Sequence, residues 1–168
     1  MRRKILVIVG THEQQFDRLV KASDALAKNH DVFIQSGYSD YQPQIAEFEK
    51  MVSFKKIETL TKWADIIITH GGPGSILDAL KIKKVPIVIP REKKYGEHVN
   101  DHQVQFAEYL KARQKIISTN NIEELEKMID NYEKLTKDIL VDSQFNTKEF
   151  TKKLEELTIS LIDTSKKK

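Results

Sequence analysis

The chain has 168 residues, a length that fits one domain, or one domain with a short appendage. Its 28 basic and 25 acidic side chains give a net charge of +3, a balance that argues against a nucleic-acid-binding protein. It contains no cysteine, which excludes disulfides, thiolate metal sites and cysteine nucleophiles. No apolar run approaches the roughly twenty residues that span a bilayer, and the start lacks a signal-peptide pattern, so we expect a cytoplasmic protein.

Strand and helix patterns alternate along most of the chain. The predicted strands cover residues 4–10, 31–35, 51–54 (weakly), 65–70, 85–90 and 115–118. The predicted helices cover residues 13–28, 42–50, 58–64, 75–81, 99–111 and a stretch from 122 that Asn120 or Asn121 can cap. Because such alternation implies parallel strands joined by right-handed crossovers, the predicted fold class is α/β, a Rossmann-like doubly wound parallel sheet.

The pattern after residue 130 is purely helical. We therefore assign residues 1–140 to a Rossmann-like domain and residues 141–168 to a C-terminal helix and basic tail. Apolar residues between 150 and 162 form a stripe that either closes the domain's own core or docks a partner. Basic clusters at 81–84, 91–94 and 166–168 are either simply solvated or attracted to an anionic membrane surface.

Two glycine-containing segments follow predicted strands, at the sheet edge where parallel α/β proteins bind ligands. In the first, Gly10 and Thr11 form a sharp turn, and the amides of the next helix would be free to hold a phosphate. The second is His70-Gly71-Gly72-Pro73-Gly74-Ser75, whose three glycines in four residues would let a ligand approach the backbone closely. It matches neither a P-loop nor a dinucleotide fingerprint. A plain tight turn is the alternative.

Asp78 lies three residues after Ser75 on the predicted helix. At that position its carboxylate can accept hydrogen bonds from both hydroxyls of a ribose. The alternative is a capping-box partner for Ser75, since an acidic residue at this spacing favours helix initiation.

A third polar segment, residues 96–103, precedes the next predicted helix. Its last three residues, Asp101, His102 and Gln103, are expected to face sugar hydroxyls; an exposed loop with a cap is the alternative. His98 and His102 have a spacing that suits metal ligands, but no third ligand is evident, so neither a metal nor another cofactor is predicted.

With these segments in this order, the chain resembles the C-terminal, donor-binding half of family 28 glycosyltransferases, which have the GT-B architecture. Residues 9–17, 64–78 and 100–103 carry the resemblance. It is strongest to the small bacterial subunits of capsule and exopolysaccharide glycosyltransferases and to the catalytic subunit of the dolichol-pathway UDP-N-acetylglucosamine transferase. The resemblance implies a UDP-sugar donor, a membrane-associated acceptor-binding subunit as partner, a lipid-linked glycan acceptor, and peripheral placement at the inner face of the membrane.

The resemblance also implies roles for individual residues. The two glycine loops would flank the donor diphosphate, through Gly10, Thr11, Gly71, Gly72, Gly74 and Ser75. Asp78 would bind the ribose, although the family usually has glutamate at this position, and Asp101 and Gln103 would approach the transferred sugar.

An inverting, metal-independent transfer needs a base for the acceptor hydroxyl and positive potential for the departing diphosphate. The helix-start amides would supply the potential. His12 follows Gly10 and Thr11, and histidine is the side-chain type that exchanges protons most readily near neutral pH, so we predict His12 as base or phosphate contact; a histidine without a catalytic task is the alternative. Two other functions compete: a non-catalytic nucleotide-sugar-binding module that regulates or stabilises a separate transferase, and a nucleotide-sugar 2-epimerase, against which the length argues.

Overall fold

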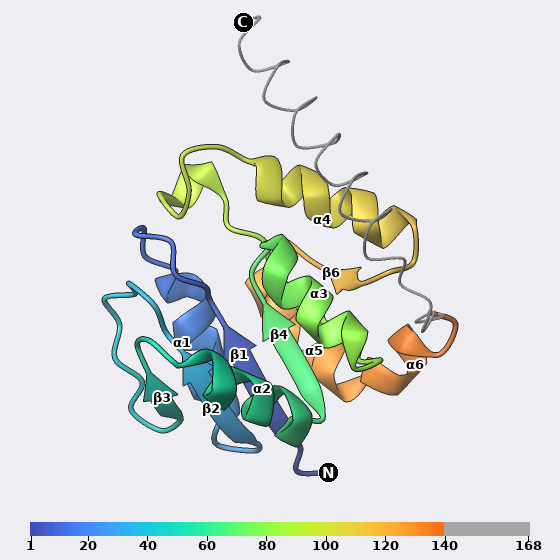
Figure 1. Cartoon of the computed structure of the whole chain (residues 1–168), viewed down its shortest axis with the longest axis horizontal. Helices are drawn as coiled ribbons and strands as arrows, with labels where there is room; N and C mark the ends of the chain where they lie inside the picture. Colours follow the sequence, from blue (N-terminus) through green and yellow to red (C-terminus); the bar gives the residue numbers. More distant parts are fainter. Residues whose placement is uncertain (140–168) are drawn as a thin grey trace, which may run out of the picture.

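A six-stranded parallel sheet forms the middle layer of the computed structural model, which describes residues 1–139 (Figure 1). The strands are β1 (Lys4–Ile8), β2 (Asp31–Gln35), β3 (Glu47–Glu49), β4 (Ile66–Thr69), β5 (Ile87–Val88) and β6 (Ile117–Ser118). Their order is β3-β2-β1-β4-β5-β6, and every neighbouring pair is parallel. The predicted doubly wound sheet is confirmed, and its strand order reverses direction between β1 and β4.

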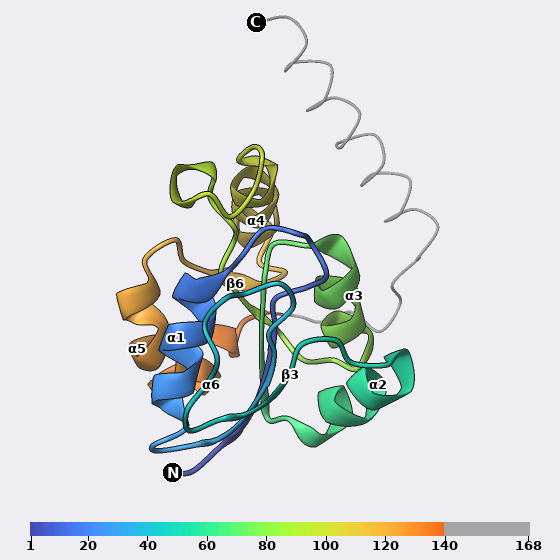
Figure 2. The same cartoon turned by 90° about the vertical axis from the view of Figure 1, so that its left-hand side faces the viewer.

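Helices cover both faces of this sheet. They are α1 (Asp17–Leu26), α2 (Phe54–Trp63), α3 (Pro73–Lys81), α4 (His102–Ala112), α5 (Leu125–Asp130) and α6 (Tyr132–Thr136), with short 3-10 turns η1 (Lys93–Tyr95) and η2 (Ile122–Glu124). Figure 2 shows α1, α5 and α6 on one side of the sheet and α2 and α3 on the other. Helix α4 shares a hydrophobic cluster with α3 and therefore belongs to the second side. No helix within residues 1–139 is long and apolar enough to cross a bilayer.

The unbroken aliphatic run of β1 is explained by burial on both faces. Ile5 and Val7 pack with Leu19 in the cluster under α1, whereas Leu6 and Ile8 join the cluster on the α2 side. Because successive side chains of a strand point to opposite faces, both sets must be apolar when helices cover both sides.

The helix predicted over 42–50 and the strand predicted over 51–54 are both wrong. Residues 47–49 form the edge strand β3 instead, which pairs with β2. The carboxylate of Asp24, buried on α1, accepts hydrogen bonds from the amides of Gln44, Ile45 and Ala46 at 2.8–2.9 Å. These amides are therefore held in an extended segment by a residue some twenty positions away.

Several predicted helices begin at other residues than expected. Helix α1 begins at Asp17 and not at 13, so residues 9–16 form a real loop, called the first loop below. Helix α3 begins at Pro73 and not at 75, as suits a residue that has no amide to satisfy. Helix α2 begins earlier and α4 later than predicted. The predicted cap at Asn121 is confirmed, since its side chain accepts a hydrogen bond from the amide of Glu123. The predicted tail 141–168, with its apolar stripe, lies outside the described residues.

Candidate functional site

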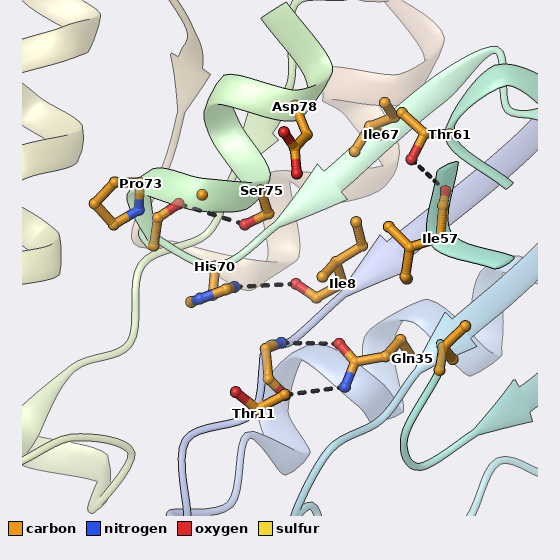
Figure 3. A pocket seen from close by; sticks show the side chains of 14 residues that line it. Ile8, Thr11, Gln35, Ile57, Thr61, Ile67, His70, Pro73, Ser75 and Asp78 are labelled. Carbon is orange, nitrogen blue, oxygen red and sulfur yellow. Dashed lines mark hydrogen bonds between the residues drawn. The ribbon is translucent and has the colours of Figure 1, made fainter. Parts of the chain in front are cut away.

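A crevice of about 390 Å³ opens beyond the carboxyl ends of β1 and β4, where the strand order reverses (Figure 3). It brings together seven residues that the sequence predicts for the site: Gly10, Thr11, His70, Gly72, Gly74, Ser75 and Asp78. Ile8, Val52, Ile57 and Ile67 form an apolar side, and Gln35 adds a polar one. A larger hollow of about 560 Å³ lies near β2, β3 and α2 but contains none of the predicted residues. The strand-order reversal therefore identifies the crevice beside β1 and β4 as the candidate site.

The glycines of residues 70–75, called the donor loop below, are needed for different reasons. A Cβ on Gly72 would lie 2.1 Å from Nε2 of His70, and one on Gly10, whose φ is +83°, would lie 2.7 Å from the same ring. A Cβ on Gly71 would lie 2.7 Å from the Cβ of Gln103. A Cβ on Gly74 would meet nothing within 4 Å. Packing inside the protein therefore explains Gly71, Gly72 and, in the neighbouring loop, Gly10; of these four glycines only Gly74 leaves room for a ligand.

The first turn of α3 presents backbone donors to this open space. Within residues 1–139, no backbone hydrogen bond engages the amides of Gly74 and Ser75. The side chain of Ser75 is fixed within the protein, since its hydroxyl accepts a hydrogen bond from the Thr69 hydroxyl at 2.7 Å. Unpaired amides at a helix N-terminus, together with the helix dipole, favour an anion.

The capping-box alternative for Asp78 is wrong. Gly72 is the N-cap of α3, and the carboxylate of Asp78 pairs with Lys81 at 2.9 Å on the exposed side of the helix. Because Asp78 also lines the crevice, its carboxylate lies where a ligand on the first turn of α3 can reach it.

The first loop offers fewer donors than the sequence predicts. The amide of Gly10 donates to Oε1 of Gln35 at 3.0 Å, and Nε2 of Gln35 donates back to the carbonyl of Gly10 at 2.9 Å. The amide of Asp17, at the start of α1, donates to Oε1 of Gln15. Of the two helix starts predicted to bind phosphate, α1 therefore has its first amide engaged by a side chain, whereas the amides of Gly74 and Ser75 in α3 make no backbone hydrogen bond within the described residues. Gln35 was missed by the sequence analysis; the available signal was a polar residue ending an apolar strand.

His70 is neutral in this structure. Burial is the main reason that its pKa falls to about 4, and the positive charge of Arg91 lowers it further. Its Nδ1 lies 3.3 Å from the carbonyl of Ile8, which can only accept, so the neutral ring carries its hydrogen on Nδ1. The imidazole therefore supplies shape and a hydrogen bond and no positive charge.

Arg91 is a second residue that the sequence analysis missed, because it was counted in a basic cluster. It is fully buried, and its guanidinium donates to the carbonyls of Val9, Gln14, Gln15 and Glu97 at 2.8–3.0 Å. Burial lowers its pKa to about 10, with Glu97 acting in the opposite direction, so Arg91 is charged at neutral pH. This cation holds the first loop against the segment that follows β5.

The third polar segment packs beside the crevice and does not line it. Oε1 of the buried Gln103 accepts hydrogen bonds from the amides of Gly71 at 3.1 Å and Arg91 at 3.3 Å. Asp101 accepts one from the amide of Lys93 at 2.8 Å. Two of the three predicted sugar contacts, Asp101 and Gln103, thus have structural partners, and the NH₂ group of Gln103 is the part of its amide without a partner within the described residues.

Three histidines form a cluster at this edge. The ring centroid of His98 lies 4.4 Å from that of His12 and 4.5 Å from that of His102. Burial is the main reason that the pKa of His98 falls to about 4, and neighbouring His102 and His12 lower it further. In the part of the chain that the structure covers, no group of three or more histidine or acidic side chains is arranged to hold a metal ion.

A model of the glycosyltransferase family 28 C-terminal domain matches residues 4–161. The chain belongs to this family. Two curated relatives, each named UDP-N-acetylglucosamine transferase subunit ALG13, share shorter stretches with this family 28 domain. The Yarrowia lipolytica protein is 37% identical over 54 residues, which cover 32% of this chain and 26% of the relative. The Candida glabrata protein is 33% identical over 64 residues, which cover 38% of this chain and 30% of the relative.

Solved structures of GT-B glycosyltransferases share the fold of this family 28 domain. The glycotransferase of kitacinnamycin has a TM-score of 0.58 at 18% identity, covering 81% of this chain and 35% of its own. SnogD from Streptomyces nogalater has a TM-score of 0.54 at 18% identity, covering 82% of this chain and 40% of its own. The calicheamicin glycosyltransferase CalG4 has a TM-score of 0.54 at 15% identity, covering 93% of this chain and 44% of its own. The chain thus spans less than half of each of these proteins.

Proposed function

We propose that this chain is the donor-binding, catalytic subunit of a glycosyltransferase and holds a UDP-sugar in the crevice between Gly10 and α3. The observation that carries the proposal is the first turn of α3, where Gly74 leaves open space in front of two unpaired amides. A diphosphate there would gain hydrogen bonds and the favourable end of the helix dipole, which also stabilise it as the leaving group.

The other parts of a UDP-sugar have matching surroundings. Asp78 would bind the ribose, and its exposed pair with Lys81 is worth only about 0 to 1 kcal/mol, so it is easily exchanged for a ligand. The apolar side made by Val52, Ile57 and Ile67 would cover the base. The names of the two curated relatives make N-acetylglucosamine the first sugar to test.

The remaining features are proposed on the resemblance. They are an inverting, metal-independent reaction, a lipid-linked glycan acceptor in capsule or exopolysaccharide synthesis, and a membrane-associated partner subunit that supplies the acceptor half. The relatives named as transferase subunits support a partner, and so do the GT-B structures, of which this chain covers less than half.

The donor site is tested by replacing Gly74→Val and measuring UDP binding by calorimetry. The new methyl groups would enter open space, so we expect a folded protein whose affinity for UDP falls at least tenfold because the amides are covered. Lys81→Ala is the matched control on the same helix, since it removes the partner of Asp78 without touching the first turn. Unchanged affinity in Gly74→Val would refute the site.

A non-catalytic nucleotide-sugar-binding module would give the same calorimetry. The two functions differ in turnover. If this chain is a non-catalytic module, turnover by the separate transferase depends on no side chain of this chain. The variants of the histidine cluster described next separate the two functions.

A further inference from the structure

The histidines of the cluster differ in which ring nitrogen their neighbours engage. Nδ1 of His12 accepts a hydrogen bond from the amide of Gln14 at 3.2 Å, and Nδ1 of His98 accepts one from the amide of Asn100 at 3.4 Å. A backbone amide can only donate, so Nδ1 is unprotonated in both rings. Each neutral ring therefore carries its hydrogen on Nε2, where it can donate a hydrogen bond but cannot take a proton.

His102 has the opposite arrangement. Its Nδ1 contacts Oδ1 of Asn100, and the same Oδ1 accepts a hydrogen bond from the backbone amide of His102 at 3.3 Å. Because that amide can only donate, the atom facing it is the oxygen of Asn100 and not its nitrogen. An oxygen in turn requires a hydrogen on Nδ1 of His102, which leaves a lone pair on Nε2.

We infer that His102, and not His12, is the general base of the transfer, and that Asn100 is the positioning residue that selects its tautomer. The inference rests on the proposed function. In the step, Nε2 of His102 takes the proton of the acceptor hydroxyl while that oxygen forms a bond to the anomeric carbon. The bond from this carbon to the diphosphate oxygen breaks, and UDP leaves with the electron pair. Oδ1 of Asn100 then faces the Nδ1–H of the imidazolium.

His102 lies beside the crevice, one residue from the contact between α4 and residues 70–75. It is exposed at the start of α4, and the next residue, Gln103, bonds directly to the backbone of Gly71 in the donor loop. His70 also has an unprotonated Nε2, but this atom is packed against Gly72. Partial burial of its ring and then the neighbouring His12 lower the pKa of His102, which favours the neutral imidazole.

The tautomers can be measured directly by NMR of isotope-labelled imidazoles in the full chain without ligand at neutral pH. The expected result is a hydrogen on Nδ1 of His102 and on Nε2 of His12 and His98. A hydrogen on Nε2 of His102 would overturn the inference, and this measurement requires no turnover.

The chemical role is tested by UDP release from UDP-N-acetylglucosamine. We expect His102→Gln to lower kcat about 100-fold or more with little change in KM for the donor, and to remove the acid-side limb of the pH profile. His12→Gln should keep that limb. Asn100→Ala should lower kcat and shift the His102 tautomer. Asn100→Asp keeps an acceptor oxygen, so it should have the kcat and the His102 tautomer of the unmodified chain. Gln105→Ala, exposed on the same helix, is the folding and activity control.

The outcomes separate this inference from the proposed function. Failure of the unmodified chain to bind UDP in calorimetry contradicts the donor site itself. Normal UDP binding together with unchanged turnover in His102→Gln contradicts the assignment of the base, and unchanged turnover in His12→Gln as well would favour the non-catalytic module. If His12→Gln lost the acid-side limb of the pH profile and His102→Gln kept it, His12 would be the base instead.

Discussion

Gly72 and Gly74 stand two positions apart in the donor loop, yet only one of them faces open space. Both line the crevice, but Gly72 is required because the imidazole of His70 occupies the place of a side chain, whereas a Cβ on Gly74 would meet nothing within 4 Å. The sequence shows three glycines in four residues and cannot tell these reasons apart, because the contact of His70 with Gly72 depends on the ring's orientation. Ligand binding at this loop therefore stays a prediction, and packing inside the protein accounts for two of its three glycines.

This difference predicts opposite effects on stability. Gly72→Ala places a methyl group 2.1 Å from Nε2 of His70 and should lower the free energy of unfolding by about 1–3 kcal/mol. Gly74→Ala meets no neighbour and replaces a helical glycine, so it should raise that free energy by up to about 1 kcal/mol. Urea unfolding of both variants checks the pair, and equal effects would contradict the assigned contacts.

Among the elements, the segment between β2 and α2 departs furthest from its prediction. Local apolar spacing favours a helix over 42–50, but Asp24 accepts hydrogen bonds from three of its amides and from the hydroxyl of Tyr41. Four long-range hydrogen bonds to one buried carboxylate outweigh a helix propensity that amounts to fractions of a kcal/mol per residue. Nothing local in the sequence marks Asp24 as their acceptor.

The same carboxylate makes stability depend on pH. Burial acts to raise the pKa of Asp24, but the hydrogen bonds from Ala46, Gln44 and Ile45 outweigh it, so the pKa lies below its usual value. Its stabilisation is therefore complete above the unfolded pKa, near about 3.9, and is lost as the pH falls through the lower folded value. Asp24→Asn should cost about 1–3 kcal/mol at neutral pH, and this difference should shrink in acid. A constant difference in urea unfolding across that range would contradict this account.

At the scale of the whole molecule, the sequence predicts the fold class, and the crevice that holds most of the predicted site residues lies at the expected edge of the sheet. Short apolar runs are the main signal, and they locate five of the six strands that the described residues form; the runs at 4–10 and 65–70 also lead directly into glycine. The first loop was less predictable, because Gln35 and Arg91 reach it from other strand ends to bind its amides and carbonyls. Such side-chain contacts depend on the finished fold and leave no periodic pattern in the chain.

The central claim is that the unpaired amides of α3 hold the donor diphosphate. A crystal structure of the chain with UDP tests it most directly. We predict diphosphate oxygens within about 3 Å of the amide nitrogens of Gly74 and Ser75, with the ribose beside Asp78. A nucleotide bound elsewhere, with the first turn of α3 open to solvent, would contradict the claim.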